Sequence, residues 1–191
     1  YSMLAQPFST LDITNLLKSK NNRHLLDINK LPDVTVYTCC HNQGRFLNDC
    51  LDSIKAQSWT DWELVIIDDA STDNTPQVIL DWLSAQTDGI RSRVRVHRNT
   101  ENRGLPASSN LAVGLARGRY IVRVDSDDMI DSEYIYRCKT ELEENRAWCA
   151  LFTGYRRADV NLAYLGDFAN EDYHPGCAFF RKSALNEVLY K

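Results

Sequence analysis

Three carboxylates stand close together in the middle of the chain, and their spacing suggests cation chemistry. Asp125, Asp127 and Asp128 follow a mostly apolar run, 121–124, that is typical of a buried strand. Carboxylates this close repel one another unless a cation lies among them. Because alternate residues at a strand end point to the same side, Asp125 and Asp127 could share a ligand, with Ser126 opposite. We predict that they bind Mn²⁺ or Mg²⁺ together with substrate phosphates; the alternative is a solvated turn that caps the next helix.

A second acidic pair, Asp68-Asp69, ends another apolar run. Asp69 could accept hydrogen bonds from a sugar hydroxyl or a base N–H group. Alternatively, both aspartates could belong to a polar loop with residues 71–74, whose side chains favour turns. Arg103 could donate charge-assisted hydrogen bonds to a diphosphate, with a surface arginine as the alternative, and His41 could line the same pocket. Together these side chains predict a polar ligand, a metal-bound phosphate compound.

Short apolar runs alternate with helix-like segments along the chain. Strands are expected at about 34–38, 64–67, 94–97, 120–124, 147–153 and 176–181, and helices at about 46–54, 75–83, 106–117 and 132–144. Gly118 is expected to cap the third of these helices. This alternation predicts an α/β fold with a doubly wound, mostly parallel sheet and helices on both faces. Ligands bind such sheets beyond the carboxyl ends of the strands, where both acidic clusters are expected.

The size and composition of the chain favour one globular domain and exclude several functions. Its 191 residues suffice for one α/β domain, expected at 31–191, after a helical extension or linker at 1–30. A net charge of −4 gives no basic stripe for nucleic acid, and no apolar run approaches the roughly 20 residues of a membrane span. The six cysteines contain no C-x-x-C spacing, so we expect reduced thiols in a cytoplasmic protein. Because the chain opens on Tyr1 rather than Met, we expect an excised domain or a processed chain.

Several segments, in this order, resemble the family 2 glycosyltransferases, which have the GT-A fold. The matching segments are 34–42, 46–58, 62–75, 102–110 and 116–128, within about residues 33–182. The resemblance implies transfer of a sugar from a nucleotide-sugar donor, most often a UDP-sugar, with inversion at the anomeric carbon. The acceptor would be a hydroxyl group of a glycan, a lipid-linked molecule or a protein.

The resemblance also implies roles for particular residues. The nucleoside is held by the strand-end segment and by one aspartate, here Cys39, His41, Asn42 and Asp69. The D-x-D motif, here Asp125-Ser126-Asp127, holds the ribose, the diphosphate and Mn²⁺ or Mg²⁺, with Asp127 as the foremost direct metal ligand.

Two departures from the family pattern affect these expectations. The family has Pro-x-Tyr-Asn where residues 39–42 are Cys-Cys-His-Asn, so His41 would stack on the base in place of a tyrosine. The catalytic base of the family lies in an acidic motif after the last predicted strand, and we expect it beyond Lys191. Glu171 and Asp172 precede that strand and are the candidates within the chain. We therefore expect an N-terminal donor-binding portion, truncated before the acceptor-side region.

Two other functions compete with a transferase. A non-catalytic module, or an inactive fragment, would bind the nucleotide-sugar without transferring the sugar. A phosphorylation-switched receiver domain also gathers aspartates at strand ends, but it needs its acidic pair after the first strand and a lysine after a later one. Here the pair Asp68-Asp69 follows the second strand, and no matching lysine is evident.

Overall fold

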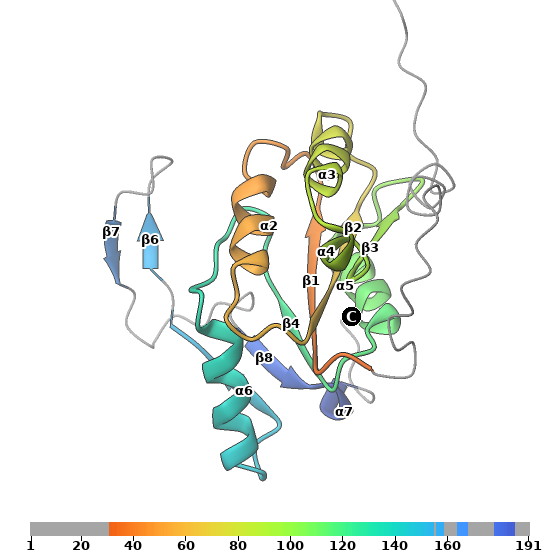
Figure 1. The fold of residues 1–191 in the computed structure, drawn as a ribbon. Helices are drawn as coiled ribbons and strands as arrows, with labels where there is room; N and C mark the ends of the chain where they lie inside the picture. Colours follow the sequence, from red (N-terminus) through yellow and green to blue (C-terminus); the bar gives the residue numbers. More distant parts are fainter. Residues whose placement is uncertain (1–30, 155, 159–163, 168–177, 186–191) are drawn as a thin grey trace, which may run out of the picture.

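The centre of the molecule is a six-stranded sheet with the strand order β3-β2-β1-β4-β8-β5 (Figure 1). The structure is a computed structural model and describes residues 31–154, 156–158, 164–167 and 178–185. The strands of the sheet are β1 (Val34–Cys40), β2 (Trp62–Asp68), β3 (Val94–Arg98), β4 (Tyr120–Arg123), β5 (Ala150–Phe152) and β8 (Ala178–Arg181). The first four are parallel, whereas β8 is antiparallel to both β4 and β5. The prediction of a mostly parallel α/β sheet is confirmed.

Helices connect the strands, and a small hairpin follows β5. The helices that the structure describes are α2 (Leu47–Lys55), α3 (Thr75–Ser84), α4 (Asp88–Arg91), α5 (Gly104–Leu115), α6 (Tyr134–Glu144) and α7 (Lys182–Leu185). The hairpin is a separate antiparallel pair, β6 (Arg156–Ala158) and β7 (Tyr164–Asp167). The sequence predicts α2, α3, α5 and α6 to within two residues at either end, because each buries an apolar face. The predicted extension at 1–30 lies outside the described residues.

One face of the sheet is covered by α2, α3 and α6 (Figure 1). Their buried side chains form one apolar cluster with the strand residues that point to this face. The helices contribute Leu47, Cys50, Leu51, Ile54, Ile79, Trp82, Leu83, Ile135, Cys138 and Leu142, and the strands contribute Val36, Leu64, Ile66, Val122 and Phe179, among others. Burial of such side chains stabilises the fold by about 1.5–3 kcal/mol each. The cluster therefore fixes α2 and α6 on the sheet beside β1 and β4.

The opposite face is covered by α5 (Figure 1). Ala112 and Val113 of this helix, and Ala116 just after it, pack on a second apolar cluster of the sheet. The strand members of this cluster are Tyr37, Val65, Ile67 and Ile121. The predicted arrangement with helices on both faces is confirmed.

Gly118 does not cap α5, and the prediction that it does is wrong. The helix has ended before it, and Ala116 is extended, with φ −61° and ψ 135°. Two buried side chains bind the N–H groups that would otherwise continue the helix. Glu63 Oε1 accepts from the Arg117 N–H (2.7 Å), and Thr35 Oγ1 accepts from the Gly118 N–H (2.8 Å). A side chain at Gly118 would collide with β1, because its Cβ would lie 2.4 Å from the Thr35 nitrogen.

We expect Gly118→Ala to lower the free energy of unfolding by about 1–3 kcal/mol, because the new methyl group overpacks the backbone of β1. The matched control is Gly114→Ala inside α5, where a Cβ meets no atom within 4 Å. That change should raise the free energy of unfolding by about 0.5–1 kcal/mol through helix propensity. Urea denaturation of both variants measures the two changes, and equal effects would contradict the close approach at Gly118.

Candidate functional site

The carboxyl ends of β2, β1 and β4 lie side by side, so the polar segments that follow them meet at one edge of the sheet. The Asp69 N–H donates to the carbonyl of Cys40 (2.8 Å), and the Val124 N–H donates to the carbonyl of Tyr37 (3.0 Å). Asp69 therefore lies on one side of the end of β1, and Asp125 lies on the other. The two predicted acidic clusters do share one edge.

Asp69 is buried at this edge, and its carboxylate accepts several hydrogen bonds. Asn99 Nδ2 (2.6 Å) and the Arg103 N–H (2.9 Å) donate to Oδ1, and the Gly104 N–H (2.8 Å) donates to Oδ2. Burial alone would raise the pKa of Asp69, but these hydrogen bonds outweigh burial and hold its pKa below the usual value. The carboxylate is therefore ionised at neutral pH and fixes the loop that begins α5. Oδ2 retains the capacity to accept a further hydrogen bond from a ligand.

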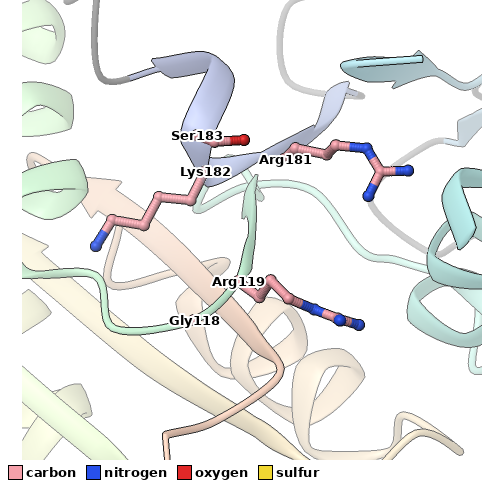
Figure 2. A pocket seen from close by; sticks show the side chains of 5 residues that line it. All are labelled: Gly118, Arg119, Arg181, Lys182 and Ser183. Atoms are coloured by element: carbon pink, nitrogen blue, oxygen red, sulfur yellow. The ribbon is translucent and has the colours of Figure 1, made fainter. Parts of the chain in front are cut away.

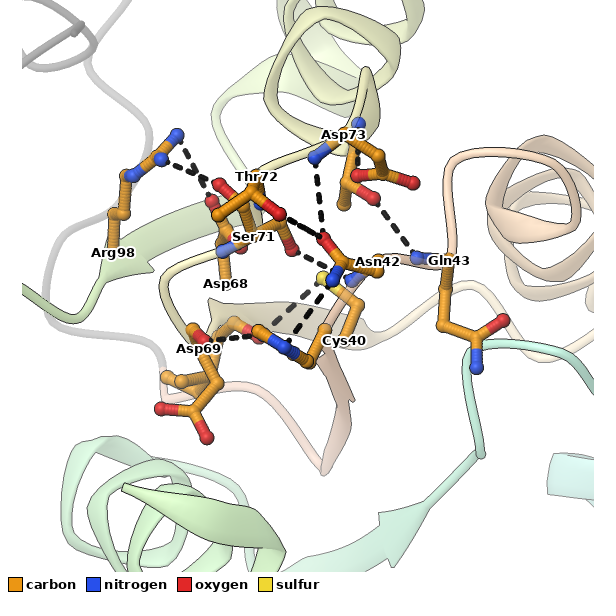
Figure 3. A network of polar contacts seen from close by, with 12 residues as sticks. Cys40, Asn42, Gln43, Asp68, Asp69, Ser71, Thr72, Asp73 and Arg98 are labelled. Atoms are coloured by element: carbon orange, nitrogen blue, oxygen red, sulfur yellow. Dashed lines mark hydrogen bonds and ion pairs between the residues drawn. The ribbon is translucent and has the colours of Figure 1, made fainter. Parts of the chain in front are cut away.

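The turn after β1 is tied to the loop after β2 (Figure 3). Asn42 has φ 57°, in the left-handed region that asparagine tolerates better than most residues. Its Oδ1 accepts from the N–H groups of Thr72 (2.8 Å) and Asp73 (3.2 Å). His41 Nδ1 lies 2.8 Å from the carbonyl oxygen of Asp69, which places a proton on Nδ1. The Asn42 side chain thus holds the loop together, while the His41 ring is exposed to a ligand.

Asp68 stabilises the same loop from inside the protein (Figure 3). Its Oδ1 accepts from the Ser71 N–H (3.0 Å), and its Oδ2 pairs with Arg98 Nη1 at 3.2 Å. Arg98 also donates to the carbonyl of Ser71 (2.8 Å). The two neighbouring aspartates therefore differ: Asp68 is a buried structural anchor, whereas Asp69 reaches the edge of the site.

The D-x-D segment after β4 contains aspartates in different surroundings. Asp125 is half-buried and pairs with the buried Arg123, with 2.8 Å between Nε and Oδ1 and 3.3 Å between Nη2 and Oδ2. Ser126 is buried, whereas Asp127 and Asp128 are exposed. Asp127 is thus the aspartate of the motif that an external cation can reach most freely.

Gln57, just after the end of α2, anchors the segment that follows these aspartates. Its Nε2 donates to the carbonyl of Asp131 (2.7 Å), and its Oε1 accepts from the Ile135 N–H (3.0 Å). One helical turn earlier, Ser53 Oγ accepts from the Ile130 N–H (3.2 Å). Since α2 is fixed by the apolar core, these bonds transmit its position to the acidic loop.

Cys39 and Arg103 complete the predicted set. The Cys39 Sγ lies 4.0 Å from Ser109 Oγ, and burial raises the pKa of its thiol to about 12. The thiol is therefore neutral and does not act as a thiolate ligand at physiological pH. The Arg103 side chain is exposed, while its backbone N–H serves Asp69. The edge thus gathers the strand-end residues Cys39, His41, Asn42, Asp69, Asp125, Ser126 and Asp127 and the start of α5 with Arg103.

Glu171 and Asp172, the predicted candidates for the base, lie outside the described residues. Their position relative to the edge of the sheet stays a prediction.

The oxygen donors of this edge fit a hard divalent cation. Within the described part of the chain, no group of three or more His, Cys, Asp or Glu side chains could hold a metal ion. Mg²⁺ is typically bound through one or two carboxylates together with substrate phosphates, and carboxylates also suit Mn²⁺. The exposed Asp127, with the half-buried Asp125 beside it, matches this requirement. The donor set therefore suits an ion that the phosphates of a ligand also bind.

Three residues of the site escape the sequence analysis: Asn99, Gln57 and Arg123. Asn99 and Gln57 give no local signal of these roles, because the bonds that build the site reach 30 residues for Asn99 and 74 and 78 residues for Gln57. Arg123 does give one, since an arginine inside the apolar run of a buried strand needs an anionic partner.

A separate cleft of about 490 Å³ lies near the start of β4, at the opposite edge of the sheet (Figure 2). Its cationic side chains bind the protein itself. Lys182 Nζ donates to the carbonyl of Ala116, and Arg181 Nε donates to the carbonyl of Trp148 (2.7 Å). The cleft is lined by Gly118, Arg119, Arg181, Lys182 and Ser183. These contacts join β8 and α7 to neighbouring segments, and we do not place the candidate site there.

We expect Asp69→Asn to lower the free energy of unfolding by about 1–3 kcal/mol at pH 7, because an amide cannot replace both acceptor oxygens. The pKa of Asp69 is held below its usual value of 3.8, so its contribution is complete above that pH. It is lost as the pH falls through the pKa of the folded state. Denaturation at several pH values should show the gap between wild type and variant narrowing below about pH 4. A gap that stays constant in acid would contradict this assignment.

We expect Gln57→Met to loosen the acidic loop, because the Ile135 N–H and the Asp131 carbonyl lose a buried partner. Hydrogen exchange should quicken about tenfold or more at residues 130–135, as expected for a local loss of about 1.4 kcal/mol or more. Amides of β2 report on global stability. Gln77→Met is the matched control, since this exposed glutamine donates to Asp81 on its own helix (2.8 Å), away from the acidic loop. Equal exchange at 130–135 in both variants would refute the anchoring role.

No helix in the described ranges is long and apolar enough to cross a membrane.

The sequence matches known proteins over most of the region that builds this edge. The pattern of the family described as Glycosyl transferase family 2 matches residues 35–167. A hyaluronan synthase of Pasteurella multocida is 33% identical over 143 residues, which are 75% of this chain and 14% of that protein. A chondroitin synthase of Escherichia coli is 30% identical over 132 residues, 69% of this chain and 18% of that protein. The chain therefore spans less than a fifth of the length of these two relatives.

Solved structures share the fold. S. aureus TarS 1–349 in complex with UDP-GlcNAc superimposes with a TM-score of 0.66 at 20% identity, over 82% of this chain and 48% of that one. Mannosyltransferase PcManGT from Pyrobaculum calidifontis, in complex with GDP-Man and Mn²⁺, gives a TM-score of 0.68 at 22% identity, over 92% of this chain and 52% of that one. The fold is the GT-A fold of these glycosyltransferases. Because the family pattern covers more than half of the sequence, the chain belongs to glycosyl transferase family 2.

Proposed function

We propose that this chain binds the nucleotide-sugar donor of an inverting, metal-dependent glycosyltransferase, and that the donor is a UDP-sugar. The observation that carries the proposal is the placement of Asp69 and the D-x-D aspartates on either side of the end of β1, in a chain of this family. Ligands of parallel α/β sheets bind at such carboxyl ends. The sugar acceptor is a hydroxyl group of a glycan, a lipid-linked molecule or a protein.

The nucleoside lies between the turn after β1 and the start of α5. The exposed ring of His41 stacks on the base, and Asp69 Oδ2 accepts a hydrogen bond from a base N–H or a ribose hydroxyl. Cys39, neutral and partly buried, forms the floor between them. Arg103 is exposed at the start of α5, from where its guanidinium can reach a phosphate.

The diphosphate lies over the D-x-D segment, where Asp127 is the direct metal ligand. A bound Mn²⁺ or Mg²⁺ supplies charge neutralisation for the nucleoside diphosphate that leaves when the glycosidic bond breaks. The chain contributes the exposed carboxylate of Asp127, and Gln57 and Ser53 hold the loop that carries it. The mannosyltransferase PcManGT, which shares the fold, is in complex with both GDP-Man and Mn²⁺, which supports this assignment.

A base must take the proton of the acceptor hydroxyl during transfer. At this edge of the described sheet, Asp68, Asp69 and Asp125 are already paired with donors or cations, so none of them suits the role. Glu171 and Asp172 remain the candidates within the chain. Because these carboxylates are paired and cannot act as the base, they favour the second function, in which the chain binds a nucleotide-sugar without transferring the sugar.

Calorimetric titration with UDP, with and without Mn²⁺, tests the proposal, and a UDP-sugar hydrolysis assay follows. Metal-dependent binding with turnover supports a transferase, and Glu171 and Asp172 are then tested by substitution. Metal-dependent binding without turnover supports the non-catalytic alternative. If GDP bound more tightly than UDP, the proposed donor would be a GDP-sugar instead of a UDP-sugar. Binding of neither nucleotide would contradict the proposal.

We expect Asp127→Asn to weaken UDP binding in the presence of Mn²⁺ by about tenfold or more, equivalent to about 1.4 kcal/mol or more. The side chain is exposed, so the unfolding temperature should stay that of the wild type. The control is Asp81→Asn, because Asp81 is also exposed but lies on α3. This variant should keep the wild-type affinity for UDP. Unchanged UDP affinity in Asp127→Asn would sink the metal assignment.

A further inference from the structure

Arg123 is a charged residue at the buried carboxyl end of β4. Its side chain is 7% exposed, and its neighbours Val122 and Val124 belong to the apolar core. A guanidinium in such a place has a large desolvation cost, and replacing a buried ion pair by apolar residues is often neutral or stabilising. Stability alone therefore does not explain the residue. Its position, two residues before the first aspartate of the D-x-D segment, suggests a role at the site.

The contact between Arg123 and Asp125 involves both carboxylate oxygens. Nε lies 2.8 Å from Oδ1, and Nη2 lies 3.3 Å from Oδ2. The contact at Oδ1 is an ion pair and the contact at Oδ2 is a hydrogen bond, so the guanidinium restrains the carboxylate at both oxygens. About a quarter of the Asp125 side chain stays exposed (24%), so the fixed carboxylate is still accessible to a ligand.

The ion pair between Arg123 and Asp125 makes Asp125 and Asp127 suitable for different ligands. A divalent cation bound to Asp125 would lie next to a guanidinium, and like charges at such a distance repel strongly in a partly buried site. Hydroxyl donors meet no such repulsion, since a carboxylate offers about four acceptor positions and the hydrogen bond from Arg123 Nη2 occupies one of them, at Oδ2. Asp127 is exposed and belongs to none of the ion pairs that the structure assigns within the described residues. Asp125 thus suits hydroxyl groups, and Asp127 suits the cation.

The surroundings of Cys39 place this pair next to the proposed nucleoside site. Burial is the main cause of the raised pKa of the Cys39 thiol, and the charges of Arg123, Asp125 and Asp69 act on it further. These three charged groups therefore surround the end of β1, within electrostatic reach of the same thiol.

We propose that Arg123 is a positioning residue that holds Asp125 for the ribose hydroxyls of the donor and reserves Asp127 for the metal ion. The inference rests on the proposed function. Arg123 acts through Asp125 and does not itself contact the nucleotide.

The experiment is a double-mutant cycle on UDP binding with saturating Mn²⁺, measured by calorimetry for Arg123→Met, Asp125→Asn and the double variant. Arg123→Met should weaken UDP binding about tenfold, and Arg123→Lys, which keeps the charge but loses the fork, should weaken it less. The double variant should bind UDP no more weakly than Asp125→Asn alone, because the arginine has no other route to the ligand.

A second measurement uses Mn²⁺ alone, followed by electron paramagnetic resonance. Without nucleotide, Arg123→Met should bind Mn²⁺ about tenfold more tightly than the wild type, because Asp125 becomes a second protein ligand. Arg95→Met is the control, since it breaks another arginine–carboxylate pair, with Glu63 (2.9 Å), away from this edge. The control should change neither the UDP affinity nor the Mn²⁺ affinity.

The outcomes separate this inference from the proposed function. If the wild type binds UDP and Arg123→Met binds it equally well, the positioning role is refuted and the proposed function stands. Additive losses in the cycle would mean that Arg123 contacts the nucleotide directly, which also overturns the proposal. If the wild type binds neither UDP nor GDP, both the positioning role of Arg123 and the proposed function are refuted. Should Arg123→Met fail to fold, Arg123→Lys and the uncharged double variant decide between the same outcomes.

Discussion

The hydrogen bonds of the buried Asp69 carboxylate are the interaction on which the geometry of the site depends. They join the end of β2 to Asn99, which follows β3, and to the backbone that begins α5. The backbone of the same residue is bonded to Cys40 and His41 at the end of β1. A buried carboxylate that loses its partners is costly, so neither segment can shift alone. Asp69 therefore sets the separation of the two segments that the proposed function assigns to the nucleoside.

The aspartates at this edge fall into two groups according to burial. Those that are buried or half-buried are compensated, by Arg98, by N–H donors or by Arg123, and they maintain the architecture. The others are exposed and are presented on a loop that α2 anchors through Gln57. The first group comprises Asp68, Asp69 and Asp125, and the second comprises Asp127 and Asp128. Because of this division, an exposed carboxylate can bind a cation while the paired carboxylates keep the edge of the sheet in place.

The sequence predicts the elements well and their partners poorly. Periodic apolar residues identify the four parallel strands and most helices, since one-sided burial leaves a local pattern. The alternation also places both acidic clusters at one edge. What it cannot supply is the pairing across the fold: Asn99 meets Asp69 only because β3 lies beside β2. Gly118 shows the same limit, because Glu63 and Thr35, distant in sequence, bind the backbone that a local rule assigns to a helix cap.

The distribution of charge links the proposed donor to the proposed metal ion. Asp68 and Asp125 are paired and Asp69 is surrounded by N–H donors, whereas Asp127 is exposed and has no ion pair with any of the described residues. At about 4 Å near a protein surface, one such carboxylate repels each phosphate charge by roughly 4 kcal/mol. A divalent cation held by Asp127 would turn this repulsion into attraction. Under the proposed function, diphosphate and cation each strengthen the binding of the other, and thermodynamic linkage makes that coupling equal in both directions.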